Sequence, residues 1–188
     1  MDAYLAVSDV IDWKHPALLK LAQELAGETP LETARRCFEW VRDEIKHSYD
    51  YQLNPVTCSA SDVLEAGTGY CYAKSHLLAA LLRANGIPAW LCYQRLRVNE
   101  EEDRYSLHGL NAVYLPDYGW YRMDARGNKS TVNAQFTPPV EQLAFKLEYD
   151  GDADLPGICA EPLVEVVQAL HSYKTWDHLL LNLPDVTL

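Results

Sequence analysis

The hydrophobic pattern of this 188-residue chain changes its period at Pro88. Before that residue, apolar side chains recur three and four positions apart, which is typical of amphipathic helices. After it, apolar and aromatic side chains dominate residues 89–96 and alternate with polar ones over 107–115 and 119–125, which favours strands. Helices followed by consecutive strands indicate an α+β fold, with N-terminal helices packed on an antiparallel sheet.

Caps mark the ends of the predicted helices. Pro16 opens the first helix, which Gly27 closes, and Thr29 begins a capping-box pattern that starts a second helix reaching about His47. A surface loop is expected over residues 48–57. The remaining helices are expected over residues 61–65, from Cys71 to about Asn85, and over 163–170.

Composition limits the classes of partner. The chain has 16 Lys and Arg against 27 Asp and Glu, a formal net charge of −11, which argues against nucleic acid or an anionic membrane as the main partner. With 48% hydrophobic residues and no internal repeat, residues 1–188 are expected to form a single domain. The oligomeric state is left open by the sequence.

The cysteines and the N-terminus bear on localisation. Five cysteines without a CxxC pair do not resemble a disulfide framework. The first residues lack a basic region followed by an apolar one, so no secretory signal is visible. We therefore expect a cytoplasmic, soluble, reduced protein.

Cys71 is the first candidate for chemistry. It follows the run Gly67-Thr-Gly69-Tyr and lies at the start of a predicted helix. Backbone N–H groups and the positive end of the helix dipole stabilise a thiolate at such a position. The alternative is a buried structural cysteine.

His108 and Asp124 are the candidate partners of the thiol. His108 lies near the start of one predicted strand and Asp124 at the end of the next, with a hairpin turn at Pro116–Gly119 between them. If the hairpin pairs residues whose numbers sum to about 232 to 234, the two side chains share a face and lie one diagonal neighbour apart. Asp would then orient the imidazole, which takes the thiol proton. The alternative for each residue alone is a structural role, with His108 as a histidine at the start of a strand and Asp124 as a turn residue.

At these residues the sequence resembles the transglutaminase-like superfamily, whose members are papain-fold Cys-His-Asp enzymes. The match runs from about residue 57 to 128. Residues 59–71 resemble the family's segment that leads to the nucleophilic cysteine. Residues 79–89 resemble the end of the nucleophile helix and the start of the next strand, and residues 108–124 resemble the strands that carry the His and the Asp. The resemblance implies Cys71 as nucleophile, His108 as general base and acid, and Asp124 as its orienting group.

The resemblance also implies an activity. We expect a cysteine hydrolase or acyltransferase that acts on peptide or isopeptide amide bonds through a thioester acyl-enzyme, without metal or organic cofactor. Hydrolysis of a peptide or protein substrate is favoured over cross-linking by analogy with the family. The alternatives are acyl transfer like that of arylamine N-acetyltransferases, and a peptide-binding module with a silent site.

Other residues receive weaker interpretations. The second oxyanion donor is left open among Tyr49, Tyr51, Gln52 and Asn54. Trp120 is read as a core residue, with shielding of the His-Asp pair as the alternative. Lys74 is expected on a solvated helix face, and His47 in a surface or cap role. Residues 137–188 are expected to pack back as a cap. The cysteines expected to serve in packing are Cys37, Cys58, Cys92 and Cys159.

Overall fold

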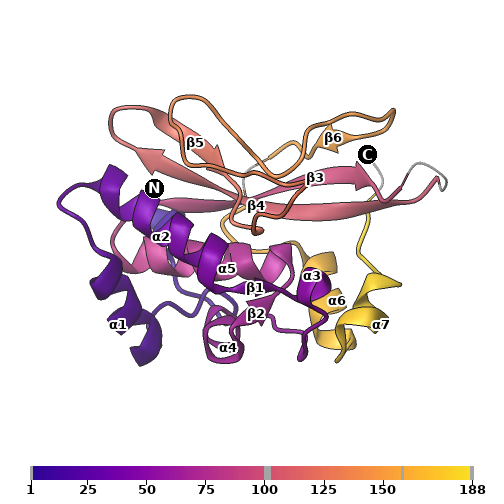
Figure 1. Cartoon of the computed structure of the whole chain (residues 1–188). Helices are drawn as coiled ribbons and strands as arrows, with labels where there is room; N and C mark the ends of the chain where they lie inside the picture. Colours follow the sequence, from indigo (N-terminus) through magenta and orange to yellow (C-terminus); the bar gives the residue numbers. More distant parts are fainter. Residues whose placement is uncertain (1, 100–102, 158, 187–188) are drawn as a thin grey trace.

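The computed structural model describes residues 2–99, 103–157 and 159–186, and it is built in two layers (Figure 1). One layer is a curled antiparallel sheet, and the other is a group of helices against one of its faces. The predicted α+β architecture is confirmed. In the described part of the chain, no helix is both long and apolar enough to cross a membrane.

The first two long helices begin where the sequence predicts. α1 is Pro16–Leu25, with a proline in its first turn. α2 is Pro30–Glu44, and the Thr29 hydroxyl accepts a hydrogen bond from the Glu32 amide at 3.1 Å. This cap satisfies an N–H group that has no partner inside the helix. α2 ends earlier than predicted, because the backbone becomes extended at Ile45.

The segment after α2 differs from its prediction. A loop was expected over residues 48–57, but α3, Ser48–Tyr51, forms its first turn. Just before it, β1 is Lys46–His47 and pairs in parallel with β2, Thr68–Gly69. This pairing brings His47 next to the residues that lead into the central helix.

The central helix is α5, Cys71–Ala84, and every residue from Cys71 to Arg83 is buried. Because a helix buried on all sides needs partners on all sides, it determines how the layers meet. α1, α2 and α4 (Ala60–Ala66) pack on it from the helical layer, and the sheet packs on it from the other side. Leu77, Leu78, Leu81 and Leu82 are fully enclosed there.

The main sheet has the strand order β5-β4-β3-β6, with antiparallel neighbours throughout. Its strands are β3 (Ala89–Arg97), β4 (Tyr105–Leu115), β5 (Gly119–Met123) and β6 (Ala153–Asp154). Across the β4–β5 hairpin the numbers of paired residues sum to 234, which lies within the predicted range. Residues 100–102 of the charged tip between β3 and β4 lie outside the described residues.

Trp120 is neither a core residue nor a shield for His108. It is 36% exposed, and its ring stacks on Trp90 with centroids 3.8 Å apart. Tyr4, from the 3-10 helix η1 (Asp2–Leu5), contacts both rings. Both interpretations of Trp120 are wrong, because its ring packs on the exposed side against Trp90 of β3, two strands away in the sheet, and against Tyr4 near the N-terminus.

The C-terminal segment returns to the start of α5. It contains α6 (Val164–Ser172) and α7 (Trp176–Leu180). The Tyr70 hydroxyl donates to the Trp176 carbonyl at 2.5 Å, and the Leu107 amide donates to the Pro184 carbonyl at 2.8 Å. In Figure 1, α7 lies beside α6 and close to α3.

Candidate active site

Cys71 is the first residue of α5, as predicted, and the residue is buried, with 8% of its surface exposed. Tyr70 is the N-cap, and no side chain caps the helix. The N–H groups at the start of the helix therefore have no side-chain cap. The Gly109 amide donates to Sγ at 3.5 Å, so a second backbone dipole points at the thiol.

Gly109 explains how β4 reaches the start of α5. A Cβ atom at this position would lie 3.0 Å from the Cα of Tyr72, a backbone contact that cannot shift cheaply. Glycine therefore allows strand and helix to approach closely. The same approach places His108, one residue earlier, beside Cys71 in one pocket.

The structure brings His108 and Asp124 together in the way the hairpin register predicts. Nε2 of His108 donates to Oδ2 of Asp124 at 2.7 Å, and both side chains are buried. The Asp124 carboxylate also accepts from the amides of Arg126 at 3.1 Å and Ala144 at 3.0 Å. Since Nε2 is engaged by the carboxylate, Nδ1 is the ring nitrogen left for the thiol.

Two opposed effects act on His108. Burial alone would lower its pKa, but the negative charges of Asp124 and Cys71 outweigh burial and raise the pKa of His108 to about 10. For Asp124, burial opposes ionisation, yet His108 and the two backbone donors hold the pKa of that carboxyl below its usual range. At neutral pH the imidazole is therefore an imidazolium, paired with the Asp124 carboxylate.

A pocket of about 260 Å³ opens beside these residues, and most of its wall is apolar. The hydroxyls of Tyr70 and Tyr72 donate to the carbonyls of Trp176 and Leu107, so the two rings present mainly carbon to the space. The other apolar residues of the wall are Leu96, Val98, Leu107, Phe145, Leu180 and Leu183.

His47 is a pocket residue that the sequence analysis missed. It was expected at the surface or in a cap, but it is 5% exposed and lines the same pocket as Cys71 and His108. Its ring meets Tyr70 edge to face, with centroids 5.5 Å apart. Burial, reinforced by the positive charge of Arg126, holds the pKa of His47 well below its ordinary value, so the ring is neutral at pH 7. No local sequence signal marks His47, because its burial follows from the pairing of β1 with β2.

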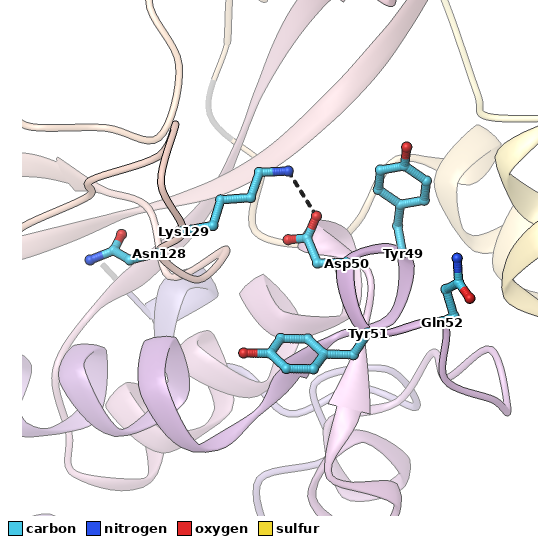
Figure 2. Close-up of a pocket in the computed structure, with 6 residues that line it drawn as sticks. All are labelled: Tyr49, Asp50, Tyr51, Gln52, Asn128 and Lys129. Carbon is cyan, nitrogen blue, oxygen red and sulfur yellow. Dashed lines mark hydrogen bonds and ion pairs between the residues drawn. The ribbon is translucent and has the colours of Figure 1, made fainter.

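Asp50 and Lys129 were also missed, and they belong to a neighbouring polar pocket of about 430 Å³ (Figure 2). Figure 2 shows Lys129 pointing toward Asp50, and its Nζ donates to Oδ1 at 2.9 Å. Arg126 donates two hydrogen bonds to the same carboxylate, at 2.5 and 3.1 Å. Tyr49 lines this pocket and the one at Cys71, so the two adjoin.

The expectation for Lys74 is wrong. Its side chain is fully enclosed, and Nζ donates to the carbonyls of Ile45 at 2.5 Å and Arg42 at 3.3 Å. These carbonyls end α2 and lack partners within that helix, which makes a buried donor favourable there. Burial lowers the pKa of Lys74 to about 7.

The remaining candidates are dispersed. Of the four residues considered as oxyanion donors, Tyr49 lines the Cys71 pocket, Tyr51 and Gln52 line the pocket of Figure 2, and Asn54 accepts from the Trp176 amide. Cys37 and Cys58 are buried, and Cys92 and Cys159 are partly buried. No group of three or more candidate metal ligands occurs among the described residues.

Comparison with known proteins identifies the family. The model of the transglutaminase-like superfamily matches residues 19–125, which is more than half of the chain. The chain belongs to this superfamily. No curated protein matches it. The matched region contains Cys71, His108 and Asp124 and extends further toward the N-terminus than the segment on which the resemblance was based.

Solved structures are similar to part of this chain, and the first of them supports the fold. A candidate cysteine protease from Cytophaga hutchinsonii is 22% identical, with a TM-score of 0.52, over 65% of this chain and 40% of that one. The periplasmic domain of TgpA from Pseudomonas aeruginosa is 23% identical, with a TM-score of 0.48, over 65% of this chain and 45% of that one. A candidate protease from Parabacteroides distasonis is 14% identical, with a TM-score of 0.43, over 64% of this chain and 24% of that one. This chain thus spans less than half the length of each.

Proposed function

We propose that this member of the superfamily is a cysteine-dependent hydrolase or acyltransferase that acts on amide bonds of a peptide or protein. The observation that carries the proposal is the position of His108, which bonds to Asp124 and shares a pocket with Cys71 at the start of α5. Membership of a superfamily of cysteine enzymes supports it. Residue roles are assigned from this geometry.

In the first half-reaction the Cys71 thiolate attacks the carbonyl carbon of the substrate. A C–S bond forms, and negative charge develops on the carbonyl oxygen, where the Cys71 amide at the helix start is the first available donor. The imidazolium of His108 then gives its Nδ1 proton to the amine nitrogen as the C–N bond breaks. The product is a thioester on Cys71 and a free amine.

In the second half-reaction an acceptor attacks the thioester. Neutral His108 takes a proton from water or an amine, a new C–O or C–N bond forms, and the C–S bond breaks with return of the electron pair to Sγ. We favour hydrolysis over cross-linking by analogy with the protease-like structures that share the fold.

The wall of the pocket favours an apolar acyl group. Its leucines, Phe145 and the two tyrosine rings offer carbon surface to the group next to the scissile carbonyl. Burying such a group beside the thiol gains about 25 cal/mol per Å² of apolar area, whereas a charged group would lose its hydration. The two arginines that also line the pocket have carboxylate partners: Arg126 pairs with Asp50 at 2.5 Å, and Arg97 lies 3.9 Å from Asp103.

The proposal is tested by acylation with activated p-nitrophenyl esters of hydrophobic and charged N-acyl amino acids. We expect a burst of one p-nitrophenol per chain, a matching mass increase on Cys71, and faster acylation by the hydrophobic esters. Cys71→Ser should lose the burst, and Cys92→Ser, which replaces a partly buried cysteine outside the site, should keep it. Absence of a burst in the wild type with every ester would favour the silent peptide-binding module.

A further inference from the structure

The feature not used by the proposed mechanism is a second histidine–carboxylate pair in the same pocket. Nδ1 of His47 lies 3.6 Å from Oδ2 of Asp50, and that carboxylate is fixed in place by Arg126 and Lys129. In the described part of the chain, Nδ1 is buried without a hydrogen-bond partner. A small rotation of the ring would complete a bond between Nδ1–H and the carboxylate.

The orientation of that pair determines what His47 offers to the pocket. A neutral imidazole carries one proton, and a carboxylate beside Nδ1 favours the proton on that nitrogen. Nε2 then carries the lone pair in a residue that lines the pocket, and the hydrogen bonds of the described residues do not include one to this atom. An acceptor atom of this kind binds an N–H or O–H group and repels a carbonyl oxygen or an oxyanion. His47 is thus unsuited to be the second oxyanion donor.

We propose that His47, held by Asp50, is the binding residue for the acyl acceptor, and that the site is built for acceptors carrying two hydrogens on the attacking atom. This inference rests on the proposed function. Two neutral imidazoles line the pocket after acylation, because His108 has by then given up its proton. One hydrogen of water or a primary amine goes to His108, and the other is held by Nε2 of His47.

The chemistry of the step follows from that arrangement. The attacking nitrogen or oxygen forms a bond to the thioester carbon, and His108 removes one proton as the C–S bond breaks. The second hydrogen stays on the attacking atom and is bonded to His47 throughout. An acceptor with a single hydrogen must give it to His108, which leaves His47 unpaired. A buried polar group left without its partner discriminates strongly against such a ligand.

The test uses acceptors that differ in this one property. The acyl-enzyme is formed from the best p-nitrophenyl ester and offered O-methylhydroxylamine, with two N–H hydrogens, or N,O-dimethylhydroxylamine, with one. Products are quantified against the hydrolysis product by mass spectrometry. We expect the wild type to prefer the two-hydrogen acceptor by about tenfold or more beyond the ratio measured for a free thioester in solution. A preference equal to that of the free thioester would overturn the proposal.

Variants separate this role from a structural one. His47→Phe keeps the ring shape without an acceptor, and His47→Gln restores an acceptor near the position of Nε2. With acceptor products counted per acyl-enzyme formed, we expect His47→Phe to lose the preference and His47→Gln to recover part of it. His171→Phe, on the exposed face of α6, is the matched control. An unchanged preference in His47→Phe would contradict the role of His47. If the wild type itself shows no p-nitrophenol burst, the proposed function is overturned instead.

Discussion

Arg126 donates two hydrogen bonds to Asp50 although the two residues are 76 positions apart. Both side chains are largely enclosed, at 6% and 14% exposure. The Arg126 amide also bonds to Asp124, so this ion pair joins α3 to the loop that carries the orienting carboxylate. It is the link between the two histidines of the pocket.

Breaking this link should destabilise the protein and disturb the site. Asp50→Asn removes the charge that compensates Arg126, and loss of one partner of a buried pair costs about 3–5 kcal/mol. We expect a decrease toward the lower end of this range in urea unfolding at pH 7, since the pair is partly exposed. Asp43→Asn, where the half-exposed carboxylate pairs with the adjacent Arg42, should change stability by roughly 0–1 kcal/mol. Equal effects of the two substitutions would contradict the assignment.

Asp124→Asn tests the role of the orienting carboxylate. The amide cannot stabilise an imidazolium, and its NH₂ group favours the wrong tautomer of His108. We expect the acylation rate to fall about a hundredfold or more, with the fold retained by circular dichroism. Asp117→Asn, in the exposed turn between β4 and β5, should leave the rate unchanged. A fall of less than threefold would show that Asp124 has no such role.

The raised pKa of His108 should make the free energy of unfolding depend on pH. Its folded value of about 10 lies above the unfolded value of about 6.5, so the charged form stabilises the fold fully below pH 6.5, and this contribution is lost as the pH rises to 10. The difference in unfolding free energy between wild type and His108→Gln should therefore be largest near pH 6 and shrink by pH 10. A difference that is constant over this range would contradict the charged state assigned to His108.

Lys74 gives a pH dependence of the opposite sign. Its folded pKa of about 7 lies below the unfolded value of about 10.4, so protonation favours the unfolded chain. Stability relative to Lys74→Met should rise from pH 7 to about pH 10 and stay level below pH 7. Lys20→Met on the exposed face of α1 is the control and should show no such slope. A level difference above pH 7 would mean that Lys74 keeps an ordinary pKa.

Local pattern was sufficient to predict the longer helices and strands of the fold. The cap at Thr29, the buried stripe that follows Cys71 and the hairpin turn all act over a few residues, and the β4–β5 register then fixed the spacing of His108 and Asp124. These are interactions whose partners stand close together in the sequence, so their periodicity and turn chemistry are visible there.

Long-range partners account for what was missed. Lys74 is buried because the carbonyls at the end of α2 accept its hydrogens, and His47 is buried because β1 pairs with β2. Asp50 gains its role from Arg126 and Lys129, more than seventy positions away. No local pattern predicts such contacts, since each residue on its own matches a solvated surface position. The extent of the domain and the cytoplasmic location stay predictions.

The proposed catalysis depends on activation of Cys71 by His108, and the rate of alkylation at each cysteine tests this activation directly. Burial raises the pKa of the Cys37, Cys58 and Cys92 thiols to about 12 and also raises that of Cys159. With iodoacetamide at pH 7 and peptide mapping by mass spectrometry, we predict that Cys71 reacts at least about tenfold faster than the other four, and that His108→Ala abolishes this advantage. Reaction of Cys71 at the rate of the others, or at the same rate in His108→Ala, would contradict the central claim.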